Sequence, residues 1–162
     1  MKSLSVTIEV TEINQLSTYN SNGDQLYNIN SMVQHAIETR QGTIVVCQMD
    51  NAEDTHQGVF EMTRDGKHIR SFKGKGKSDE ICSYKRRYVA QDNDRDRLFV
   101  SDSVKHQVLL FNSQLGPQGV LAKDEANVFK RLCYANEAHL LLICSQYGAV
   151  DIYKLCRFSR DH

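Results

Sequence analysis

The chain has 162 residues, a formal net charge of zero, 40% apolar residues and 25% charged residues. These proportions lie near globular averages and exclude a disordered chain, and no apolar run approaches the ~18 residues of a membrane span. Residues 1–10 lack the charged start, long apolar core and cleavage site of a signal peptide. We therefore expect a cytoplasmic, mainly β domain.

Short apolar strands follow one another along the chain. Residues 5–11 and 15–19 predict the middle strands of a first sheet, whose first strand we expect before Met1. Clusters of turn-forming residues separate the later runs. A second sheet is predicted from 34–38, 43–48, 58–63 and 68–72, a third from 87–91, 98–101, 106–112 and 119–122, and a fourth from 141–144 and 150–155.

The strand groups repeat at a measurable period. Tyr19, Met62, Phe111 and Tyr153 each end a strand before a polar turn, and they are spaced 43, 49 and 42 residues apart. Four short strands at this period indicate a β-propeller blade, whereas tetratricopeptide or ankyrin repeats need helical periodicity and a period near ~34 residues. We expect one domain over 1–162, with blades at about 1–30, 31–80, 81–124 and 125–162.

One copy of the repeat carries a specific motif. Residues 101–108 resemble the NHL repeat, whose aspartate and histidine match Asp102 and His106, and Phe111 ends the strand that follows. Lys105 stands where asparagine is usual, and Gln48 and Ser145 replace the aspartate in two other copies. The resemblance implies a structural role for Asp102, His106 and Phe111. It also implies a relation to the six-bladed C-terminal propellers of tripartite-motif proteins.

The length of the chain then limits the architecture. Six blades need ~270 residues, so 162 residues cover about three and a half. The predicted fold is all-β, a partial six-bladed NHL-type propeller forming an open arc of four-stranded antiparallel sheets. We expect the C-terminus to be native and the N-terminus to be cut short, so that missing blades complete the ring. The alternative is a complete, degenerate short protein whose sheet edges pair with a second copy.

No catalytic, cofactor or metal signature is evident. The five cysteines show no paired spacing, which favours reduced thiols over zinc ligands. The alternating aspartates at 92, 94 and 96 suggest a calcium loop, but Arg97 stands where a glycine is needed, and an inner hairpin turn is the simpler interpretation. Among the histidines only His35 is expected to face the channel, and one imidazole does not hold a catalytic zinc ion. We expect no enzyme, no cofactor and no metal.

The charges are unevenly distributed along the chain. Residues 1–63 hold two basic and eight acidic residues, whereas residues 64–87 hold nine basic and three acidic ones. Such a block can meet phosphates or an acidic partner, although charge runs are often only solvated loops. The candidate binding face comprises the following basic and aromatic residues: Arg64, Lys73, Lys75, Lys77, Tyr84, Lys85, Arg86, Arg87 and Tyr88.

Three functional hypotheses follow. The first is a non-enzymatic module that binds a protein partner through its loops, and the family resemblance suggests the substrate-recruiting part of a ubiquitin-ligase-like parent. The second is RNA binding through 64–87, for which only Tyr84 and Tyr88 offer aromatic stacking among the basic residues. The third and most remote is a propeller lyase or lactonase.

Overall fold

The protein is represented by a computed structural model, which describes residues 7–10, 16–19, 22, 24–29, 33–48, 58–72, 88–103, 105–126 and 128–155. Every element in these residues is a β-strand, and neighbouring strands within each sheet run antiparallel. No helix long and apolar enough to cross a membrane is found among the described residues.

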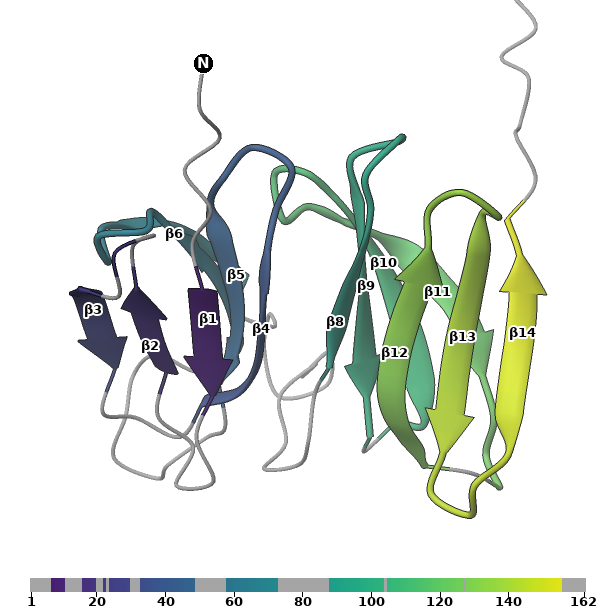
Figure 1. Ribbon diagram of the computed structural model, residues 1–162. Coiled ribbons are helices and arrows are strands. Elements are labelled where there is room, and N and C mark those ends of the chain that lie inside the picture. The colour runs from purple at the N-terminus through teal and green to yellow at the C-terminus, as the bar shows by residue number, and fades with distance from the viewer. Residues whose placement is uncertain are drawn as a thin grey trace, which may run out of the picture.

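The strands form four separate sheets, each built from consecutive strands (Figure 1). The first contains β1 (Thr7–Val10), β2 (Leu16–Tyr19) and β3 (Gln25–Ile29). The second contains β4 (Val33–Glu38), β5 (Ile44–Gln48), β6 (Gly58–Met62) and β7 (His68–Phe72). The third contains β8 (Val89–Asp92), β9 (Arg97–Asp102), β10 (Gln107–Asn112) and β11 (Pro117–Lys123). The last contains β12 (Phe129–Ala135), β13 (Leu140–Ser145) and β14 (Val150–Lys154).

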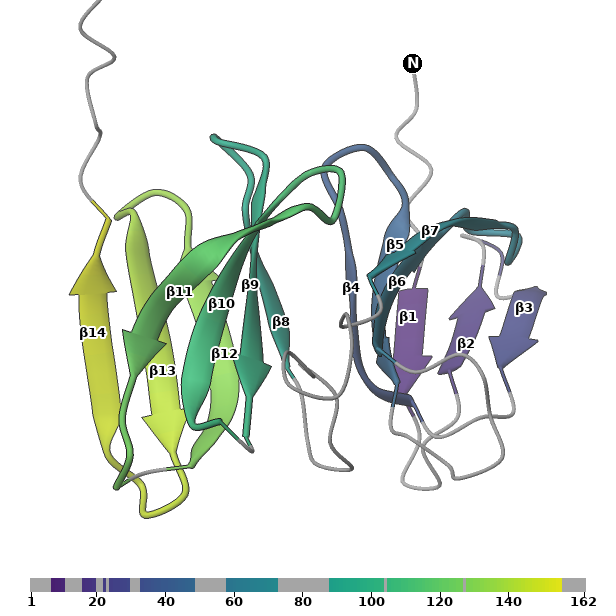
Figure 2. The same cartoon turned by 180° about the vertical axis from the view of Figure 1, so that it is seen from behind.

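The four sheets stand side by side in an open arc, which Figure 2 shows from behind. The first strands of the last three sheets are neighbours, because β4 contacts β8 and β8 contacts β12. In the first sheet, β1 runs opposite to β4 (Figure 1). β1 also contacts β4. In the same way, β5, the second strand of its sheet, contacts β8, and β9, the second strand of the third sheet, contacts β12. The strands β1 and β2 therefore correspond to the second and third strands of the complete sheets, which are the positions predicted for them.

The core lies between the sheets, and β5 shows why. All five of its residues are buried. Alternate side chains of a strand point to opposite faces, so Val45 and Cys47 pack towards the third sheet in one cluster, with Val100 and Phe111. Ile44 and Val46 pack on the other side in a second cluster, with Leu16 of the first sheet.

The third and last sheets are joined by a further apolar cluster. Phe99 and Val108 of the third sheet pack there with Leu132, Leu141 and Ile143 of the last. Phe99 also lies against the ring of Tyr134, with ring centroids 5.3 Å apart. Each sheet is thus held by the apolar face of its neighbour, since the hydrophobic effect rewards the removal of these faces from water.

The all-β class and the open arc of antiparallel sheets are confirmed, and four-stranded sheets are present as predicted. Two strands, β3 and β12, were not individually predicted. The predicted strand at 119–122 is longer in the structure, as β11 covers Pro117–Lys123. A β-bulge allows this length, because the register of β11 against β10 shifts at two places.

The aromatic contact between the second and third sheets provides a test of the packing. Phe111 has no exposed surface, and its ring meets Phe72 edge-on with centroids 4.9 Å apart. We expect Phe111→Ala to lower the free energy of unfolding by about 3–5 kcal/mol, since it removes a buried aromatic side chain. Urea denaturation followed by circular dichroism measures this, with Ile69→Ala on the exposed side of β7 as control. A loss below about 1 kcal/mol for Phe111→Ala would contradict packing between the sheets.

Candidate interaction surface

Three hairpin turns lie along the same edge of the arc, at one end of the strands. They connect the first and second strands of the last three sheets, at residues 39–43, 93–96 and 136–139, and all lie at the top of Figure 1. Each turn contains a residue with positive φ, namely Gly42 (76°), Asp96 (53°) and His139 (53°). We call these three segments together the turn surface.

Hydrogen bonds link the first of these turns to the second. The Arg40 backbone N–H donates to Gln91 Oε1 at 3.2 Å, and its guanidinium donates to the Asn93 carbonyl at 3.1 Å. Gln41 Nε2 donates to Asp96 Oδ2 at 2.7 Å. These contacts join residues more than fifty positions apart in the chain and fix one sheet's turn against the next.

The second turn is linked to the third in a similar way. The Asn93 backbone N–H donates to Asn136 Oδ1 at 2.8 Å. His139 Nδ1 lies 3.6 Å from Asp94 Oδ2 and 3.5 Å from the Tyr134 hydroxyl. The turn surface is therefore one continuous, cross-linked layer rather than three independent loops.

A buried carboxylate anchors the middle turn. Asp92 is fully buried, and it accepts hydrogen bonds from Arg97 at 2.7 Å, from Arg95 at 3.2 Å and from two backbone N–H groups of the turn. Burial alone would raise the pKa of Asp92, but the hydrogen bonds and charge of Arg97, helped by Arg95, outweigh it and lower the pKa. Burial, followed by the charge of Asp92, raises the pKa of the nearby Tyr134. The aspartate therefore holds the turn together as a charged group.

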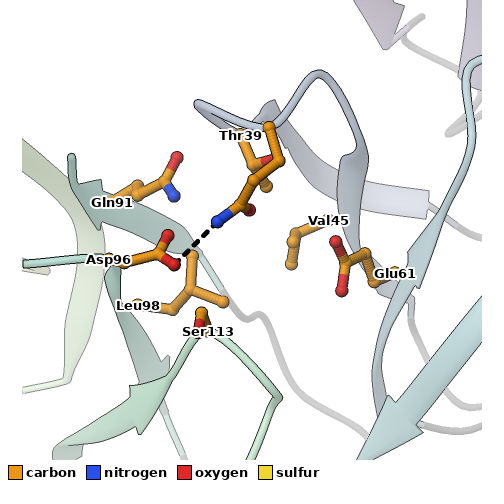
Figure 3. A pocket seen from close by; sticks show the side chains of 8 residues that line it. Thr39, Val45, Glu61, Gln91, Asp96, Leu98 and Ser113 are labelled. Carbon is orange, nitrogen blue, oxygen red and sulfur yellow. Dashed lines mark hydrogen bonds between the residues drawn. The ribbon is translucent and has the colours of Figure 1, made fainter.

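A small polar recess lies beneath the first two turns, between the second and third sheets (Figure 3). It measures about 190 Å³ including space open to solvent, below the ~300–1,000 Å³ of typical ligand pockets. Several of its polar side chains are already engaged, since Gln41 bonds to Asp96, and Glu61 accepts from Thr43 and pairs with Arg70 at 3.0 Å. The recess is thus part of the junction between two sheets rather than a substrate pocket.

His35, the histidine expected to face the channel, bridges two sheets. Its Nδ1 accepts a hydrogen bond from the Val89 backbone N–H at 3.2 Å, and its ring lies 5.4 Å from that of Tyr88. Burial, followed by the positive charge of Arg131, lowers the pKa of His35. No group of three or more His, Cys, Asp or Glu side chains that could hold a metal ion occurs within the described ranges.

Most of the predicted basic face lies outside the described residues. This applies to Lys73, Lys75, Lys77, Tyr84, Lys85, Arg86 and Arg87. Of the remaining two, Arg64 forms an ion pair with Glu38, and Tyr88 packs its ring on His35 and bonds to Ser101 through its backbone. Only two of the nine residues are therefore described, and the basic face stays a prediction.

The residues of the repeat motif lie around one turn and in the core. Asp102 is buried, and its Oδ1 accepts a hydrogen bond from the Lys105 backbone N–H at 3.2 Å. His106 has a positive φ of 49°, and its Nδ1 donates to the Glu125 carbonyl at 3.1 Å. Phe111 lies in the cluster between the second and third sheets. Their contacts are those of residues that shape the fold.

The comparisons with known proteins support the same architecture. No family model matches the sequence, and no curated protein sequence matches it. Among solved structures, the chain is similar to the C-terminal WD40 domain of Sif2, with a TM-score of 0.62 and 17% identity over 91% of this chain and 39% of that chain. It is also similar to Saccharomyces cerevisiae Sqt1, with a TM-score of 0.63 and 10% identity over 92% and 42%.

A third solved structure is a complex of KlAtg21 with the coiled coil of AgAtg16. It matches with a TM-score of 0.65 and 11% identity, over 93% of this chain and 50% of that chain. The fold is that of a β-propeller. This chain spans half or less of each of the three propeller chains, and identities of this size establish the fold alone. The resemblance of 101–108 to the NHL repeat stays a prediction.

The His35 contact predicts a pH dependence. Because the pKa is lowered in the folded protein, the contribution of His35 to stability is complete above its ordinary value of 6.5 and is lost as the pH falls through the lowered pKa. Asparagine can place an acceptor oxygen near the position of Nδ1 without titrating. We expect His35→Asn to lose less stability than the parent protein between about pH 7.5 and pH 5, measured by urea denaturation.

The exposed His68 on β7 provides the matched control, because His68→Asn removes a histidine without touching the bridge to Val89. The role of the bridge would be refuted if His35→Asn lost as much stability as the parent protein over this pH range. It would also be refuted if His68→Asn reduced the loss of stability by the same amount as His35→Asn.

Proposed function

We propose that this protein is a non-enzymatic interaction module whose turn surface binds another protein. The observation that carries the proposal is the series of hydrogen bonds that joins the turns 39–43, 93–96 and 136–139. Turns held in this way lose little conformational freedom on binding, which reduces the entropic cost of association. Exposed polar and charged residues line the surface, namely Arg40, Gln41, Asp94 and Glu137.

The known structures of this fold are consistent with a polypeptide partner. One of them, KlAtg21, was solved in complex with a coiled coil of another protein. The recess beneath the first two turns is smaller than a typical ligand pocket, so we place recognition on the outer surface of the turns. The free thiols of Cys47, Cys133 and Cys144 suit a reducing compartment, and we infer that the protein works in the cytoplasm. A role in recruiting substrates to a ubiquitin-ligase-like parent rests on the NHL resemblance alone.

A photo-crosslinking residue can test the proposed surface directly. We would place p-benzoylphenylalanine at Glu137, which is exposed in the third turn, and as control at Ile69, on the exposed side of β7. Illumination in cells should give protein adducts from position 137 that protease removes and ribonuclease leaves intact. Equal adducts from both positions, or none from position 137, would exclude the turn surface as the binding site.

RNA binding through residues 64–87 is the second candidate, favoured by the nine basic residues of that segment. Six phosphate contacts with single-stranded RNA should give a slope of about −4 in a plot of log affinity against log salt. Fluorescence anisotropy with a labelled uridine-rich 20-mer measures this slope. The variant Lys85→Glu/Arg86→Glu should weaken binding, and Lys105→Glu in a separate turn should not. Affinity that does not respond to salt would reject RNA as the ligand.

A further inference from the structure

We draw no further inference here: the strongest candidate, the His139 side chain that lies between Asp94 and Tyr134 where the second and third turns meet, belongs to the turn surface already described, and no observation shows that a change in its charge alters that surface.

Discussion

The structure depends on one constraint: its inner sheets have two apolar faces, and no sheet can bury both by itself. β5 shows this most clearly, because Val45 and Cys47 enter one core cluster while Ile44 and Val46 enter another. Each inner sheet therefore needs a neighbour on both sides, and the neighbours have to stand in the same relation to one another. An arc of sheets satisfies this requirement with local hairpins alone, which keeps the contacts within each sheet close in sequence. Among the described residues, the first and last sheets each pack against a neighbour on one side only.

The same stacking explains why the turns can act as a surface. Sheets that pack face to face bring their corresponding hairpins to the same end, so Arg40 reaches Asn93 and Asn93 reaches Asn136. Each bond is worth only about 0.5–1.5 kcal/mol, and their main effect is positional. The buried Asp92 adds a charged anchor under the middle turn, with Arg95 and Arg97 satisfying its oxygens. Geometry of this kind permits recognition without a pocket, which agrees with the small size of the recess at Glu61.

Much of the fold could be predicted from the sequence, because the signal was local. Runs such as Thr43–Gln48 and 98–101 are apolar on both faces and bounded by turn residues, so their strands were found. β12 was missed because Lys130, Arg131 and Cys133 interrupt its buried residues Phe129, Leu132 and Tyr134. The turn surface was also missed. Its contacts join residues from different sheets, and neither Arg40 nor Asn136 belongs to a motif. The basic segment 64–87 was conspicuous as composition, but composition did not reveal that Arg64 is paired with Glu38.

The first and last described sheets both keep features of an inner sheet. In stacked repeat architectures, an end unit needs a polar outer side if it is to face water. In the first sheet, Ser17 on that side of β2 is only 4% exposed and therefore does not face water. The last described sheet also keeps the composition of an inner sheet, with Leu140, Leu142 and Ile152 on the face opposite to the one that packs against the third sheet. Both outermost described sheets are therefore built like inner sheets, whereas the hairpin turns of the last three sheets form the surface proposed for recognition.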